Sequence, residues 1–183
     1  MRREEVIEQI QGLFKDSCTE LFGSLNCEVA IGEQNGESFE EVPIACIDAG
    51  SGDVEFLIAL QLPLSILAMT YPVTEGITMV REDYLEDWIS ELSNQLIGRL
   101  KRKLTSHECN VDIGLPTTYF GAELESLLSA NGANSERKTY FFDIDGELCA
   151  CSIALEVFND ATSYVIDPNS HNDDQNEGEL ELF

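Results

Sequence analysis

An internal repeat constrains the fold of this chain more than any other feature of its sequence. The hexapeptides at 27–32 and 109–114 share the pattern Cys-x-Val-x-Ile-Gly. Each follows a segment with helical periodicity, and each precedes a pair of extended segments whose second member contains Ile-Ala-Leu, at 58–60 and at 153–155. Such self-similarity is typical of a chain built from two copies of one supersecondary unit. We therefore interpret the sequence as helix–strand–strand–strand written twice.

Hydrophobic spacing predicts the elements of each unit. Apolar residues at three- and four-residue intervals predict helices over 3–23 and about 82–105, with a short helical or irregular stretch over 63–69. Extended segments are expected at 27–31, 42–48, 54–62, 109–115, 139–144 and 148–157. Turn signals at 49–53 and at Asp145-Gly146 join neighbouring segments as hairpins. We expect an α/β domain of the α+β type, with internally duplicated units, a largely antiparallel sheet and long helices packed on one face.

The C-terminal end differs in composition from the rest of the chain. Residues 159–183 contain seven Asp and Glu and no Lys or Arg, which is typical of a solvated acidic tail. We therefore expect one domain over 1–158 and a disordered acidic tail over 159–183.

The charge balance excludes several classes of function. Ten Lys and Arg stand against 35 Asp and Glu, a formal charge of −25, whereas binders of nucleic acid or anionic membranes need an excess of basic side chains. The chain has no long uninterrupted apolar run, and its start, Met1-Arg2-Arg3-Glu4-Glu5, is no signal-peptide core. We expect a cytoplasmic protein that binds neither nucleic acid nor membrane.

Six cysteines accompany only two histidines, and no Cys-x-x-Cys pair occurs. This pattern gives little support to a structural metal site. Cys149 and Cys151 would share one face of a strand, where they could pair or bind a metal. Small buried thiols in a reducing compartment are the more common situation, so we predict free cysteines and no bound metal.

The long helix has two contrasting faces. At about 100° per residue one stripe is apolar, with Trp88 at its edge; it consists of Leu85, Ile89, Leu92, Leu96 and Leu100. Opposite it lie Asp87, Glu91 and Asn94, and Gly98 continues this polar stripe. Acids at i and i+4 repel each other, and Asn and Gly are weak helix formers. Exposed polar residues usually serve only solubility, but three locally unfavourable choices on one stripe indicate a surface retained for function.

Four of the ten basic residues crowd the C-terminal end of this helix, namely Arg99, Lys101, Arg102 and Lys103. Cations there complement the helix dipole. In a strongly acidic chain they also offer a local positive surface to an acidic partner. We single out Arg102 as a candidate contact for such a partner.

The polar stripe resembles a known family signature. The spacing Asp87-x-x-x-Glu91-x-x-Asn94, followed by Gly98, is similar to that of the CheC/CheX/FliY phosphatases of bacterial chemotaxis. The family pattern is Asp or Ser, three residues, Glu, two residues and Asn. The motif by itself is moderately specific, and it gains weight from its position on the solvent-facing stripe of a long helix.

A second stretch extends the resemblance. Residues 113–121, with Pro116, are similar to the strand that follows the helix in that family, and the likeness covers about residues 3–158, including the duplicated layout. The resemblance implies hydrolysis of the aspartyl phosphate on a CheY-type response regulator. An acyl phosphate is already activated, so such an enzyme mainly has to position a water in line with the phosphorus.

The resemblance also implies roles for individual residues. Asn94 would position the water with its carboxamide, and Glu91 would pair with the active-site lysine of the receiver and fix the docked register. Asp87, where the family tolerates Ser, would supply a supporting contact, and the small Gly98 would let a partner approach closely. Mg²⁺ would come from the regulator's own acidic pocket, so this chain would bind no cofactor itself.

The first helix carries Asp16 and Glu20 at the same spacing, but Gly23 stands at the Asn position. With a genuine duplication this is a degenerate second site; otherwise both acids are ordinary exposed residues. A single complete motif resembles the CheX branch of the family, and that branch implies a homodimer.

Other functions are alternatives to the phosphatase hypothesis. The chain could be a catalytically inactive receiver-binding adaptor in a two-component pathway. It could also be an acidic adaptor that binds a basic partner through its sheet or through its tail, which ends in Leu180-Glu-Leu-Phe183. A hydrolase with its own nucleophile is disfavoured, since the sequence has no Gly-x-Ser-x-Gly elbow or Walker loop and His107 fits a helix end.

Overall fold

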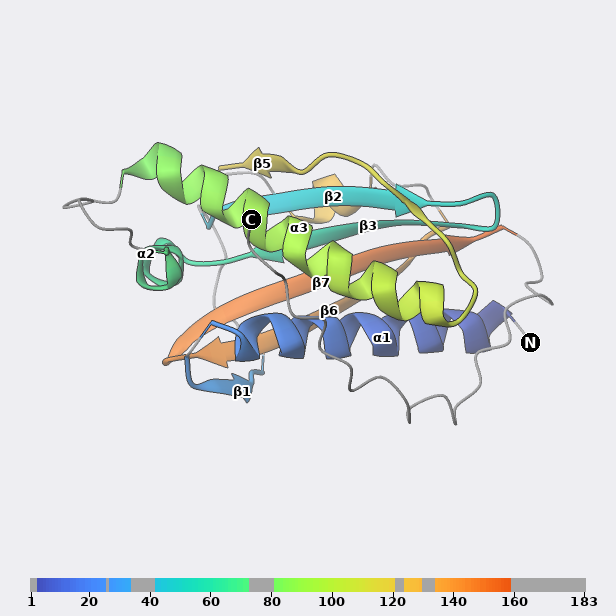
Figure 1. Cartoon of the computed structure of the whole chain (residues 1–183), viewed down its shortest axis with the longest axis horizontal. Helices are drawn as coiled ribbons and strands as arrows, with labels where there is room; N and C mark the ends of the chain where they lie inside the picture. Colours follow the sequence, from blue (N-terminus) through green and yellow to red (C-terminus); the bar gives the residue numbers. More distant parts are fainter. Residues whose placement is uncertain are drawn as a thin grey trace, which may run out of the picture.

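A seven-stranded antiparallel sheet carries two long helices side by side on one face (Figure 1). The computed structural model describes residues 3–25, 27–33, 42–72, 81–120, 124–129 and 134–158. The two long helices contact each other as well as the sheet. This arrangement confirms the α+β class and the antiparallel sheet predicted from the sequence.

The elements follow the predicted order. The helices are α1 (Arg3–Gly23), α2 (Leu64–Thr70), α3 (Glu82–Ser106) and α4 (Leu124–Ser129). The strands are β1 (Val29–Ile31), β2 (Ile44–Gly50), β3 (Val54–Gln61), β4 (Asp112–Ile113), β5 (Thr117–Tyr119), β6 (Glu136–Ile144) and β7 (Glu147–Val157). Both long helices form where apolar side chains recur every three or four residues, so that each can bury one stripe against the sheet.

The order of the strands reproduces the sequence repeat. It is β1-β6-β7-β3-β2-β4, with β5 also paired to β2. The hairpins β2–β3 and β6–β7 meet at the centre, where Ile58 pairs with Ile153, two residues that the repeat aligns. Each unit's first strand pairs with the hairpin of the other unit, β1 with β6 and β4 with β2. The two units are therefore interlocked rather than placed one after the other.

The glycines that end the repeated hexapeptides have the same structural role. The backbone N–H of Gly32 donates to the carbonyl of Phe141, and that of Gly114 donates to the carbonyl of Asp48, each at 2.9 Å. A Cβ on Gly32 would lie 3.1 Å from the backbone carbonyl carbon of Phe142, and one on Gly114 would meet the Asp48 carboxylate. At Gly32 the backbone of β6 leaves little room for a side chain, whereas at Gly114 the obstacle is the side chain of Asp48.

The core lies on both faces of the sheet. Between the sheet and the long helices, Phe14 and Phe22 of α1 and Phe142 of β6 are fully buried, and the rings of Phe22 and Phe142 lie 4.9 Å apart. A smaller cluster on the opposite face joins Leu128 of α4 to residues of three strands, namely Ile44, Cys46, Ala59 and Ala154. The short helix α4 thus covers part of the face that the long helices leave open.

The structure departs from the prediction directly after α3. The sequence predicts one strand over 109–115, whereas the chain forms only the short β4 there, and then β5. Glu108 adopts a φ of 61°, and the backbone N–H of Cys109 donates to the carbonyl of Leu104 at 2.9 Å, so these residues cap the helix instead of entering the sheet. Pro116, which has no N–H, then separates β4 from β5. Neither β5 nor α4 is predicted from the sequence as an element of its own.

The predicted acidic tail, residues 159–183, lies outside the described residues. Within the described ranges, no helix combines the length and apolar character needed to cross a membrane. The same part of the chain contains no group of three or more His, Cys, Asp or Glu side chains placed to hold a metal ion.

All six cysteines are free thiols, and five of them are buried. Cys149 and Cys151 lie on the same side of β7, facing the long helices, and burial is the main cause that raises the pKa of both thiols. Burial also raises the pKa of Cys46, on the opposite face of the sheet, to about 11. Since the thiolate is the reactive form, these cysteines are chemically protected at neutral pH.

Burial predicts how the thiols react in the folded protein. At pH 8 we expect Ellman's reagent to modify one thiol, the half-buried Cys27, and the other five only after unfolding in guanidinium. The pKa of Cys27 is also raised, first by desolvation and then by Asp145, so its reaction should be slower than that of free cysteine. A Cys27→Ser variant should show no early phase; several fast thiols in that variant would contradict the buried arrangement.

Candidate functional site

The polar stripe of α3 faces solvent. Asp87, Glu91 and Asn94 are all exposed, and they share one ridge because residues at i, i+4 and i+7 lie within about 60° of one another on a helix. The opposite stripe packs into the core; each of its side chains is at most 8% exposed, namely Leu85, Ile89, Leu92, Leu96 and Leu100. The assignment of the two faces from the sequence is therefore confirmed.

Contacts on both flanks fix the N-terminal half of this ridge. On one side the indole Nε1 of Trp88 donates to Thr70 Oγ1 of α2 at 3.0 Å, and the Tyr71 ring meets the Trp88 ring edge-on. On the other side Thr118 Oγ1 of β5 donates to Glu86 Oε1 at 2.7 Å. These contacts join segments that are distant in the sequence, so hydrophobic periodicity gives no signal for them. They hold the ridge between α2 and β5.

The carboxylate and the carboxamide of the motif have different surroundings. Gln95 Nε2 donates to Glu91 Oε1 at 3.1 Å, one helical turn further along. Within the described ranges the carboxamide of Asn94 makes no hydrogen bond, so its oxygen and its NH₂ group both face solvent. The pair can therefore contact a charged group and a water at the same time. Gln95 was not singled out from the sequence, although its i+4 spacing from Glu91 is a recognisable signal.

Gly98 leaves a gap in the side chains of the ridge. A Cβ at this position would meet nothing within 4 Å. Packing therefore does not require glycine here, in contrast to Gly32, and glycine in mid-helix costs about 1 kcal/mol relative to alanine. The gap brings the helix backbone to the surface one turn beyond Asn94.

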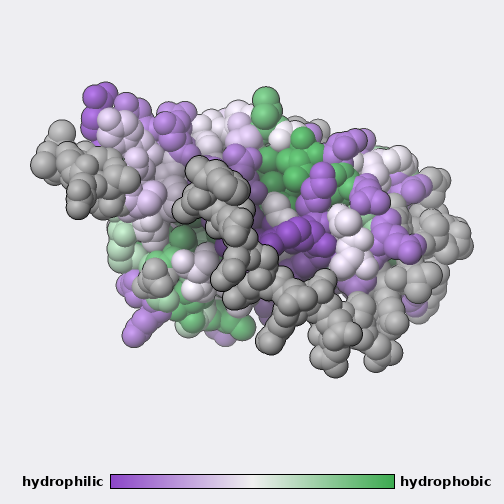
Figure 2. Space-filling view, viewed as in Figure 1, coloured by the Kyte–Doolittle hydropathy of each residue, from purple (hydrophilic) through white to green (hydrophobic). Residues whose placement is uncertain are grey.

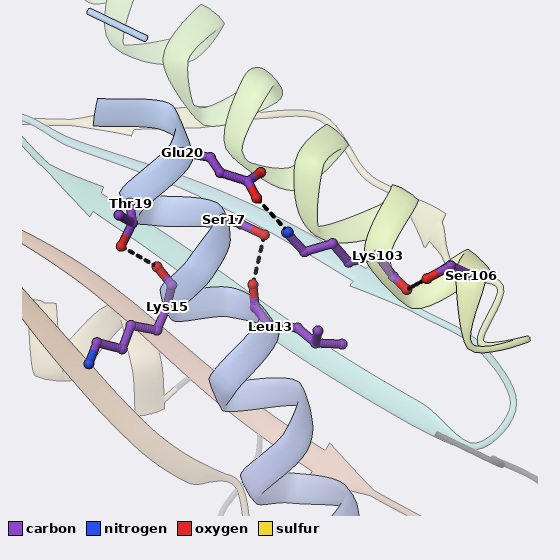
Figure 3. A network of polar contacts seen from close by, with 7 residues as sticks. All are labelled: Leu13, Lys15, Ser17, Thr19, Glu20, Lys103 and Ser106. Atoms are coloured by element: carbon purple, nitrogen blue, oxygen red, sulfur yellow. Dashed lines mark hydrogen bonds and ion pairs between the residues drawn. The ribbon is translucent and has the colours of Figure 1, made fainter. Parts of the chain in front are cut away.

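The basic end of α3 is partly engaged by α1. Lys103 Nζ lies 2.6 Å from Glu20 Oε1, and Figure 3 shows the two side chains reaching toward each other across the two helices. Arg99 Nη2 donates to Ser24 Oγ at 3.2 Å. Arg102 is exposed and forms no ion pair with a described residue. It is therefore the member of the basic cluster most available to a partner, as the sequence suggests.

Solved structures with a similar arrangement include chemotaxis proteins. CheX from Vibrio vulnificus matches with a TM-score of 0.66 and 12% identity, over 80% of this chain and 96% of that chain. CheX from Desulfovibrio desulfuricans gives 0.63 and 12%, over 81% and 99%. A CheX–CheY–BeF3–Mg²⁺ complex from Borrelia burgdorferi gives 0.56 and 14%, over 79% and 96%. This chain has the CheX fold. By sequence alone, no model of a known protein family and no curated protein matches it.

In this CheX fold, α1 occupies the position that the repeat relates to α3, but its motif is incomplete. Asp16 is exposed, whereas Glu20 is held by Lys103. At Gly23, where α3 has Asn94, no side chain is present, although a Cβ would meet nothing within 4 Å. Of the two long helices, α3 alone therefore presents both an available carboxylate and a carboxamide at the motif positions.

The open space around Gly98 predicts the effect of filling it. A Gly98→Ala variant should be more stable than the wild type by about 1 kcal/mol, because alanine restricts the unfolded chain and meets no obstacle in the helix. Urea unfolding followed by circular dichroism would measure this. Gly32→Ala is the matched control and should destabilise the fold, since its Cβ would meet backbone atoms. Equal effects at both positions would contradict the packing described above.

Proposed function

We propose that this chain is a phosphatase that hydrolyses the aspartyl phosphate of a CheY-type response regulator. The observation that carries the proposal is the α3 ridge, where Glu91 and the unengaged carboxamide of Asn94 face solvent together. A solved neighbour with this fold is a CheX in complex with CheY, BeF3 and Mg²⁺, which supports a receiver domain as the partner. The homodimer implied by the resemblance stays a prediction.

Asn94 has the chemistry that this hydrolysis needs. A carboxamide can accept a hydrogen bond from a water and donate one at the same time, and it does not itself take up the proton. Held in line with the phosphorus, the water oxygen forms the new P–O bond while the bond to the aspartyl carboxylate breaks. The products are inorganic phosphate and the free aspartate of the regulator, and the proton of the water leaves with the phosphate or to solvent.

Glu91 suits a docking role. Its carboxylate is exposed and already oriented along the ridge by Gln95, so an ammonium group of the partner could replace or join that amide without rearrangement of the helix. We assign this ammonium to the active-site lysine of the receiver. Such a charged pair fixes the register of the two proteins and thereby places Asn94 opposite the phosphoryl group. Asp87, one turn earlier, would support the same contact.

Mg²⁺ belongs to the partner in this proposal. The described part of the chain offers no cluster of metal-binding side chains. In the receiver the ion would neutralise charge that develops on the phosphoryl oxygens. The residues of this chain then only bind the receiver and position the water.

Replacing Asn94 tests the catalytic role. With a CheY-type regulator phosphorylated by a small-molecule donor in the presence of Mg²⁺, wild-type protein should accelerate loss of the phosphate. Asn94→Ala should remove at least about 99% of that acceleration, because the positioned water is lost, while binding to the regulator persists. Asn110→Ala is a matched control, since Asn110 is also exposed but lies beyond the end of α3, and it should keep wild-type turnover.

The same assay separates the alternatives. Binding that requires the phosphorylated regulator but never accelerates its decay would identify an inactive receiver-binding adaptor. Loss of partner binding on deletion of 159–183, with no effect of Asn94→Ala, would instead indicate an adaptor that works through its acidic tail. Neither binding nor turnover with any CheY-type regulator of the same organism would refute the proposed function.

The charge on Arg102 should affect encounter rather than chemistry. The chain has a net charge of −25 and must approach a receiver pocket that is also acidic, so a basic group beside the ridge lowers the repulsion. Arg102→Glu should raise KM about three- to tenfold at low ionic strength with little change in kcat, and added salt should reduce the difference. Lys138→Glu, at an exposed position of β6 without an ion pair to a described residue, carries the same charge change as a control. An equal rise in KM for both variants would argue for net charge alone.

A further inference from the structure

Leu115 is the most exposed of the large hydrophobic side chains in the described part of the chain, at 85%. It lies in the short link between β4 and β5, next to Pro116. An isolated exposed leucine needs no explanation in general. Here, however, the position of Leu115 relative to the candidate site suggests a role for its exposure.

The link that carries Leu115 lies at the β2 edge of the sheet and leads into β5, the strand that contacts the functional helix. After α3 the chain turns back and runs along β2, pairing with it first as β4 and then as β5 (Figure 1). The Thr118–Glu86 hydrogen bond ties the end of this path to α3. In the same view, Figure 2 shows a hydrophobic patch over β2 and the link, bordered by hydrophilic side chains. An apolar surface therefore lies on the same face of the molecule as α3 (Figure 1, Figure 2).

The internal repeat supplies a comparison within the same molecule. The hexapeptides at 27–32 and 109–114 align Leu115 with Glu33, which is also exposed. Glu33 belongs to the half whose motif lacks the asparagine and whose Glu20 is held in an ion pair. The half with the complete motif has an apolar side chain at the same place. The exposed leucine thus accompanies the complete site, although the fold tolerates a charged residue there.

We propose that Leu115 is an apolar docking contact for the receiver domain of the phosphorylated regulator, and this inference rests on the proposed function. The unpaired basic side chains at the end of the ridge favour this occupant, because a phosphorylation pocket concentrates acidic groups at one place. At the basic end of the ridge, Lys101 and Arg102 form no ion pair with a described residue, and they suit the acidic rim of a phosphorylation pocket. The partner should therefore present an apolar side chain beside an acidic pocket.

This assignment divides the work between three parts of the surface. The ridge supplies chemistry and register through Asn94 and Glu91, the basic end favours encounter, and Leu115 supplies apolar area that leaves water on docking. Burial of a leucine at the interface stabilises the docked complex and the transition state for hydrolysis equally. Its removal should therefore appear in KM and in binding, with kcat unchanged.

The test compares two exposed aliphatic side chains. Leu115→Ser is paired with Ile31→Ser, because Ile31 is 74% exposed on β1 at the opposite edge of the sheet. Two quantities are measured: KM and kcat for a phosphorylated CheY-type regulator, and the affinity for the same regulator loaded with beryllofluoride and Mg²⁺. We expect Leu115→Ser to raise KM and weaken binding about tenfold, and Ile31→Ser to match the wild type. Unfolding midpoints of both variants should equal that of the wild type, since neither side chain is in the core.

The outcomes distinguish this inference from the function on which it rests. If wild-type protein turns over the regulator but Leu115→Ser has an unchanged KM and affinity, the docking contact is wrong and the phosphatase function stands. An equal loss in Ile31→Ser would likewise overturn it, because the effect would not be local. If wild-type protein neither binds nor turns over any regulator, both proposals fail together.

Discussion

The exchange of first strands between the two halves is the constraint on which the rest of the structure depends. β1 follows α1 in sequence but pairs with β6, and β4 follows α3 but pairs with β2. Neither half therefore has a complete sheet of its own. The exchange also positions the helices, because α1 and α3 lead toward opposite ends of the strand path and meet on the same face. The apolar stripe of α3 is then buried in the core, and its polar ridge faces solvent.

Much of the architecture follows from the sequence because it depends on local patterns. The stripe of Leu85 to Leu100 specifies both the existence of α3 and the face that it buries, and the repeated Cys-x-Val-x-Ile-Gly predicts two related units. The remainder depends on contacts between distant segments. β5 forms through its pairing with β2, a strand far away in the sequence. The position of α4 cannot be predicted either, because the central strands beneath it are buried on both faces and show no alternating pattern of apolar and polar residues. The contacts of Trp88 with Thr70 and of Glu86 with Thr118 also join distant segments, so they cannot be predicted from the sequence.

Stability and exposure are divided between the two faces of α3. The exposed ridge combines neighbouring acids with a mid-helix glycine, and on the inner side Ser93 is fully buried without a hydrogen-bond partner among the described residues. Each of these lowers stability by a few tenths to about 3 kcal/mol. The buried leucine and isoleucine side chains offset them, since burial of one such side chain contributes roughly 1.5–3 kcal/mol. Because the inner face anchors the helix, the outer face is free to carry residues that folding alone would not favour.

The ion pair between Lys103 and Glu20 has a consequence for stoichiometry. The two groups are partly exposed, so their attraction contributes at most about 1 kcal/mol to the free energy of unfolding. Its larger effect is that Glu20, the residue of α1 that corresponds to Glu91, is held by Lys103 and is not available to a partner. The two repeat-related helices thus offer a partner a single complete binding site. Under the proposed function each chain would engage one regulator at a time, so the rate of phosphate loss would be proportional to the number of chains rather than to the number of repeats.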